Sequence, residues 1–93
     1  MTTDPYHMRR PDLAEARAAI EKLYGPGADE RWQKLLVKAG LSGRETDPDA
    51  VRRIAEAMQA TDPVTALSGR SLLIRVNTYE YLLAASEIIA DAG

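Results

Sequence analysis

Proline and glycine divide this chain of 93 residues into short stretches, and this division limits its possible folds more than any other feature. Gly25-Pro26-Gly27 and Gly40 each follow a stretch whose apolar residues recur every three or four positions. That spacing is typical of amphipathic helices. The Asp-Pro pairs at 47–48 and 62–63 predict two more helix starts, because aspartate caps a helix and proline fits its first turn.

These signals predict an all-α fold, a compact bundle of four to five short helices with a long C-terminal central helix. The first two helices are expected over 11–24 and 28–39, and a third begins at Pro48. A short fourth helix is expected over 63–67, ended by Gly69, and the last runs over 71–92. Residues 72–76 also have some β-propensity, so a short extended segment stays open for them.

The last stretch, 71–92, is apolar around much of its circumference if it is helical. Such a helix is either central to a bundle or covered by a partner. Tyr79 and Tyr81 lie two positions apart and point about 200° apart on a helix. We therefore expect one of the two rings to enter the core and the other to face outward.

Composition indicates one folded domain. Residues 1–10 are polar and aperiodic and are expected to form a flexible N-terminal tail, followed by a single helical domain over 11–93. Apolar residues make up 45% of the chain, enough for one core. We see no signal-peptide core, no membrane-spanning stretch and no cysteine, and we expect a cytoplasmic protein.

The residues needed for catalysis are scarce, and we expect no enzyme, cofactor or metal site. The single histidine, His7, falls in the expected tail, so the serines lack a general base. Asp47 and Asp49 are close in sequence, but the calcium-loop glycine and the twelfth-position glutamate are missing. We interpret them as a helix cap and a dipole-compensating carboxylate.

Four residues are candidate partner or anion contacts. Arg70 and Ser71 stand at the expected start of the last helix, where free N–H groups and a guanidinium could bind a phosphate or a carboxylate. Arg75 follows one turn later. Tyr81 is the candidate for protein contact, with Leu73 or Ile74 nearby, because exposed aromatic residues are enriched in interfaces.

Residues 63–83 have the outline of a DNA-reading helix-turn-helix, with a turn at Gly69. The packing positions of that motif hold Thr65 and Arg75, which do not suit it. The net charge of −2 also makes nucleic acid the less favoured partner.

The stretch 63–93 resembles the toxin-binding end of the Xre/MbcA/ParS group of bacterial antitoxins. That group has a Gly-Arg-Ser-like step, then an apolar run and a threonine that starts a terminal helix. The likeness covers about a third of the chain, departs from the pattern at Leu72 and Tyr81, and is too short to assign the family. The matching residues are Pro63, Leu67, Gly69, Arg70, Ser71, Leu73 and Thr78.

The leading hypothesis is a non-catalytic protein-interaction or regulatory module whose partner is another protein or a second copy. A dimer is expected if Leu73, Ile74, Tyr81 and Ile88 leave an apolar stripe exposed. The alternative is a DNA-binding or antitoxin-type regulator that uses the 63–93 region, with Arg52 and Arg53 adding to its basic residues.

Overall fold

The computed structural model describes the backbone of residues 8–92 and side chains up to residue 89. Within that range the chain forms helices α1 (Leu13–Tyr24), α2 (Ala28–Ala39), α3 (Pro48–Gln59) and α4 (Pro63–Ala92). A 3₁₀ turn, η2 (Gly25–Gly27), joins the first two helices, and residues 8–92 contain no strand. The all-helical class is confirmed, and 72–76 are helical.

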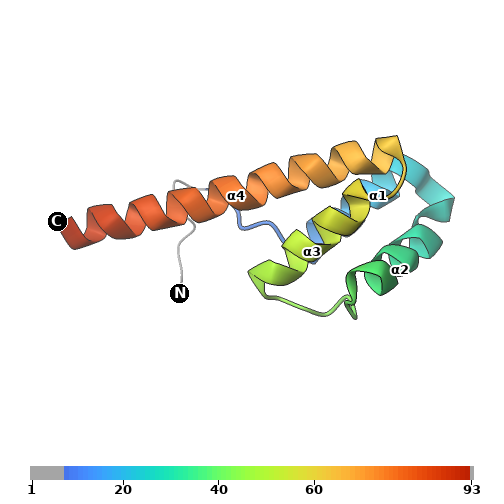
Figure 1. Ribbon diagram of the computed structural model, residues 1–93, viewed down its shortest axis with the longest axis horizontal. Helices are drawn as coiled ribbons and strands as arrows, with labels where there is room; N and C mark the ends of the chain where they lie inside the picture. Colours follow the sequence, from blue (N-terminus) through green and yellow to red (C-terminus); the bar gives the residue numbers. More distant parts are fainter. Residues whose placement is uncertain (1–7, 93) are drawn as a thin grey trace.

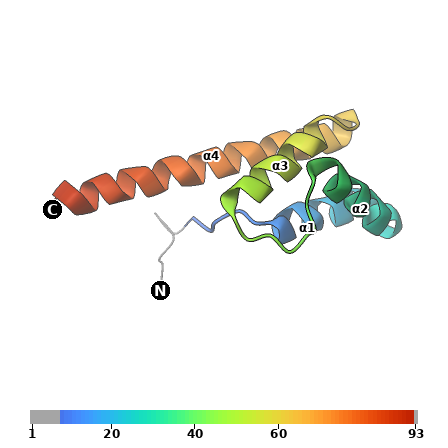
Figure 2. The same ribbon diagram turned by 60° about the horizontal axis from the view of Figure 1, so that its bottom comes forward.

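The long helix α4 runs the length of the molecule, and the three short helices gather beside its N-terminal half (Figures 1 and 2). The extents of 50 × 24 × 19 Å reflect this shape. α3 packs against α1, α2 and α4, whereas α2 packs only against α1, η2 and α3. The central helix is therefore α3, and α4 lies on one side with its C-terminal half projecting past the others.

The core lies among the four helices, and its centre is completely enclosed. Ile20, Ile54 and Met58 are 0% exposed, and Trp32 is also buried. Leu23, near the end of α1, is exposed. Tyr24, the last residue of α1, packs against the core instead.

Most predicted helix ends are confirmed. Asp47 accepts a hydrogen bond from the backbone N–H of Ala50 and caps α3. Gly40 adopts a left-handed conformation, with φ of +72°, after α2. The N–H of Leu41 then donates to the carbonyl of Leu36, as in a Schellman ending. α1 begins two residues later than expected, because Asp12 is its cap.

The predicted break at Gly69 is wrong. Residues 63–92 form one helix of 30 residues, so there are three short helices and one long one. A side chain at Gly69 would place its Cβ 2.6 Å from the carbonyl oxygen of Ala55 and 2.7 Å from Cβ of Met58. Gly69 therefore serves the close crossing of α4 over α3, and packing there overrides its low helix propensity.

The expected N-terminal tail is only partly described, since residues 1–7, including His7, lie outside the described residues. Of the remainder, Arg10 donates a hydrogen bond of 2.7 Å to the carbonyl of Thr46, and Pro11 is buried. Residues 10–11 therefore belong to the folded body.

Candidate functional site

Two faces of α4 carry side chains at heptad spacing, and they meet different surroundings. The face toward the other helices, here called the inner face, is buried at Thr65, Gly69, Leu72 and Val76. Tyr79, Leu83 and Ser86 continue this face and are half-buried. Its spacing alternates between four and three residues, which is the repeat of a helix seam that packs on another helix.

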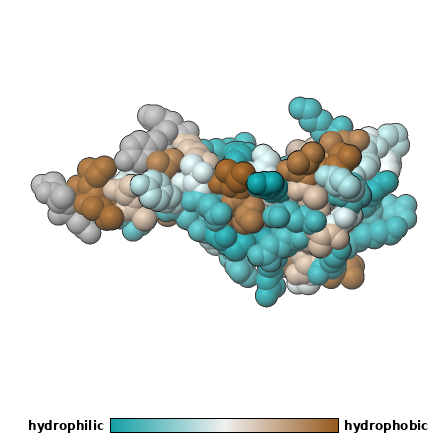
Figure 3. All heavy atoms as spheres, turned by 45° about the horizontal axis from the view of Figure 1, so that its top comes forward, coloured by the Kyte–Doolittle hydropathy of each residue, from teal (hydrophilic) through white to brown (hydrophobic). Residues whose placement is uncertain are grey.

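The opposite side, here called the outer face, has a second repeat of the same kind. Its large residues recur every seven positions and are strongly exposed: Leu67 is 69%, Ile74 57%, Tyr81 73% and Ile88 68% exposed. Between them lie residues that are mostly small, at the other heptad position: Val64, Ser71, Thr78 and Ala85. Figure 3 shows apolar side chains, in brown, recurring along the long axis of the molecule.

The large side chains of the outer face are strongly exposed, and the last turns of α4 extend beyond the three short helices (Figures 1 and 2). A helical segment of about 15 residues, roughly the projecting half of α4, is marginal in water by itself, because helix stability in proteins comes mainly from packing of an apolar face. The projecting half therefore lacks the support that a helix of its length normally has.

The four predicted contact residues fall at different places on α4. Ser71 and Tyr81 belong to the outer face, and Tyr79 and Tyr81 divide between the two sides as expected. Arg70 is exposed at the edge of the outer face and makes no ion pair with any described residue. Arg75 is half-buried on the other edge and forms an ion pair with Glu15 of α1.

The premise of an anion site at a helix start is wrong, because Arg70 and Ser71 lie inside α4. Their backbone N–H groups belong to a continuous helix and are not free to bind a ligand. Whether these side chains contact a partner stays a prediction. Of the stripe predicted from the sequence, Ile74, Tyr81 and Ile88 are exposed, whereas Leu73 is half-buried against the core. The seven-residue period of the exposed residues begins at Leu67 and was not predicted.

The helix-turn-helix interpretation of 63–83 is also wrong, since the helix has no turn at Gly69. The antitoxin resemblance implied that a terminal helix starts at Thr78, but Thr78 lies inside α4. Of the remaining basic candidates, Arg52 donates a hydrogen bond of 2.7 Å to Glu80, and Arg53 forms an ion pair with Asp49 at 3.1 Å. DNA binding stays an untested alternative with less support from the geometry.

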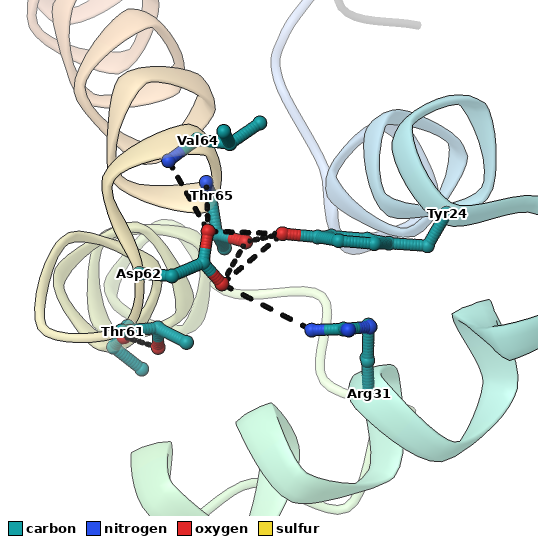
Figure 4. A network of polar contacts seen from close by, with 7 residues as sticks. Tyr24, Arg31, Thr61, Asp62, Val64 and Thr65 are labelled. Carbon is teal, nitrogen blue, oxygen red and sulfur yellow. Dashed lines mark hydrogen bonds and ion pairs between the residues drawn. The ribbon is translucent and has the colours of Figure 1, made fainter.

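A polar cluster joins α1, α2 and the start of α4 (Figure 4). The Tyr24 hydroxyl donates to both carboxylate oxygens of Asp62, at 3.0 and 3.1 Å, and contacts the hydroxyl of buried Thr65. Arg31 lies 3.8 Å from the centre of the Tyr24 ring and 3.9 Å from Asp62. The backbone N–H of Thr65, which donates to Asp62, lowers the pKa of that carboxyl below its ordinary value. The cluster caps α4 and ties it to α1 and α2.

One surface hollow of about 380 Å³ lies where α4 leaves the body. It is lined mainly by apolar side chains, with Arg10 and Glu80 as its charged members. Arg10 is hydrogen-bonded to Thr46, and Glu80 to Arg52. The two charged groups that line this hollow are therefore already engaged with other residues of the chain.

A second hollow, of about 480 Å³ beside α2, has several cationic side chains in its lining. Lys34 forms an ion pair with Glu30 at 3.3 Å, and Lys38 donates a hydrogen bond of 2.9 Å to the carbonyl of Ala60. Lys34 is thus paired within α2, and Lys38 joins α2 to the end of α3. The outer face of α4 is therefore the strongest candidate functional site.

The described residues contain no group of three or more His, Cys, Asp or Glu side chains arranged to hold a metal ion. None of the helices in residues 8–92 has both the length and the apolar character to cross a membrane. No family model, curated protein or solved structure matches the chain.

Proposed function

We propose that this chain is a non-catalytic protein-interaction module that binds a protein helix along the outer face of α4. The observation that carries the proposal is the heptad row of exposed Leu67, Ile74, Tyr81 and Ile88. A row of this kind, continued over four heptads, is the pattern by which one helix packs on another.

The dimensions and chemistry of the outer face define its partner. From Val64 to Ile88 the face is about 36 Å long, at 1.5 Å per residue. None of its heptad positions in this range holds a charged residue. A matching partner is a helix with an apolar, uncharged stripe of similar length, because an unpaired charge would be costly to bury there.

The remaining surface supports binding better than catalysis. The charged side chains that line the two hollows described above are largely engaged with other residues of the same chain. General acid–base catalysis needs such groups to converge on a substrate with adjusted pKa values. The outer face provides apolar area instead, which favours association.

The test compares two variants that introduce glutamate on different surfaces. Ile74→Glu with Tyr81→Glu places two charges on the outer face, whereas Val37→Glu places one on α2, where Val37 is 81% exposed. We expect both proteins to fold, as judged by circular dichroism. Only the α4 variant should lose binding, measured by affinity capture after nuclease treatment and by light scattering of the purified chain.

Two results would contradict the proposal. One is a wild-type chain that neither self-associates nor retains any protein. The other is a set of complexes that the α4 substitutions leave unchanged. Retention of DNA that weakens steeply with salt would favour the regulator alternative instead.

A further inference from the structure

We infer that the helix seated on the outer face is α4 of a second copy of this chain, running antiparallel, with the two-fold axis passing between residues 79 and 80. This inference rests on the proposed function and names its partner. Three properties of α4 carry it: the alternation of side-chain size, the distribution of charge and the position of the folded body.

The sizes of the outer-face side chains are self-complementary only in the antiparallel direction. A register that sets Thr78 against Tyr81 of the second copy also sets Ile74 against Ala85. The next layer in the same register pairs Ser71 with Ile88. Each layer then joins one small and one large side chain, the arrangement that fills a helix interface evenly. A parallel pair would set Tyr81 on Tyr81 and Thr78 on Thr78, giving alternately crowded and empty layers.

The charges of α4 divide at the same point. Its basic residues, Arg70 and Arg75, precede the proposed axis, and Glu80, Glu87 and Asp91 follow it. In the antiparallel pair, the basic first half of each α4 lies along the acidic last half of the other, and Arg70 comes to the level of residue 89 of the second copy. Arg70 is exposed and has no ion-pair partner among the described residues. A parallel pair would bring like charges together, and antiparallel helix dipoles also attract.

Charge also selects the register. If the second helix is shifted by one heptad, each small side chain still faces a large one, but the two-fold axis moves to residue 76. Arg75 would then lie beside its own copy, and like charges at that distance repel. The axis between 79 and 80 avoids this, because Glu80 lies on the other side of the helix and pairs with Arg52 of α3.

The folded bodies leave room for this pairing. The inner and outer faces lie about 150° apart, at 100° per residue, so the three short helices of each copy sit on the far side of its own α4. The projecting half of one α4 would cover the outer face of the other where the short helices support it. Both unsupported halves thereby gain a packing surface.

Cysteine cross-linking tests direction and register directly, because the chain has no cysteine of its own. Ser71→Cys and Ile88→Cys are prepared separately, mixed, and treated with a short bifunctional thiol reagent. We expect the mixed pair to cross-link, since packed helices lie 8–10 Å apart. Neither variant should cross-link with itself, because the two copies of residue 71 would lie about 25 Å apart along the axis. Self-linking of Ser71→Cys would indicate a parallel pair and overturn the inference.

Light scattering across concentration supplies the second test. Ile74→Glu with Tyr81→Glu should raise the dimer dissociation constant by about thirtyfold or more, the effect of losing a central interface residue. Val37→Glu should leave the constant unchanged. A monomeric wild-type chain that captures another protein through the outer face would overturn the second-copy inference while leaving the proposed function standing. A monomeric chain that captures nothing would overturn both.

Discussion

Gly69 shows how one missing side chain can set the distance between two helices. A Cβ at this position would meet backbone and side-chain atoms of α3 at 2.6–2.7 Å, so the helices would have to separate. We predict that Gly69→Ala lowers the free energy of unfolding by about 1–3 kcal/mol, although alanine is the better helix former. Chemical denaturation monitored by circular dichroism measures the effect.

Gly27→Ala is the matched control for Gly69→Ala. Gly27 has a φ of −89°, and a Cβ there would have no atom within 4 Å. Gly27→Ala should therefore change the free energy of unfolding by only about 0.5 kcal/mol. An equal loss in both variants would contradict the crossing role of Gly69.

This role of Gly69 cannot be predicted from the sequence, because glycine occurs both at helix ends and inside helices that cross closely. The same residue type ends a helix at Gly40, where φ is positive, and lies inside one at Gly69, where another helix approaches closely. The distinction depends on α3, which no local pattern around residue 69 reveals.

Thr65 is the one polar residue with a buried side chain in the described core. Its hydroxyl donates to Asp62 and contacts the hydroxyl of Tyr24. We predict that Thr65→Val, which keeps the shape, lowers the free energy of unfolding by about 1 kcal/mol, because a buried hydrogen bond is lost. Thr61→Val, at an exposed site, should change it by less than about 0.5 kcal/mol. Thermal or chemical denaturation of the two variants compares them.

At the scale of elements, the loop between α2 and α3 is organised by one carboxylate. Glu45 accepts hydrogen bonds of 2.8 Å from the backbone N–H groups of Ser42 and Gly43. The bond from Ser42 is the main cause that lowers the pKa of Glu45 from 4.5 to about 2. The ionised carboxylate thus takes the place of a backbone partner for this turn.

The lowered pKa predicts a stability difference that depends on pH. A carboxyl whose pKa is lower in the folded state stabilises the fold above the unfolded value, here 4.5, and loses that effect as pH falls toward 2. Glu45→Gln should therefore be less stable than wild type at pH 6 and equally stable near pH 2. Glu56→Gln, on an exposed face of α3, controls for the loss of one negative charge. A stability difference between Glu45→Gln and wild type that is as large at pH 2 as at pH 6 would contradict the mechanism.

The helix ends were predictable because their signals are local. Asp47, Asp62 and Gly40 act through hydrogen bonds to residues within five positions, so the sequence alone specifies them. The outer face needed knowledge of α4 as one unbroken helix. With a break assumed at Gly69, Leu67 and Ile74 fall in different elements, and their common period is lost.

At the scale of the whole molecule, the short helices support only half of α4, and the other half projects beyond them. If a second copy supplies that support, folding and association are linked, and thermal stability must rise with protein concentration. Each tenfold rise in concentration adds about 1.4 kcal/mol per dimer, or about 0.7 kcal/mol per chain. For a domain of this size, that corresponds to an increase of about 3–5 °C in the melting temperature.

Differential scanning calorimetry over a hundredfold range of concentration measures this slope. Wild type and Val37→Glu should share it, and the outer-face variant, Ile74→Glu with Tyr81→Glu, should melt at a lower temperature that does not depend on concentration. Its helix content should also be lower, because the end of α4 frays without a surface to pack on. A wild-type melting temperature that stays constant over the range would mean that α4 is stable alone, and the second copy would then have no part in the fold.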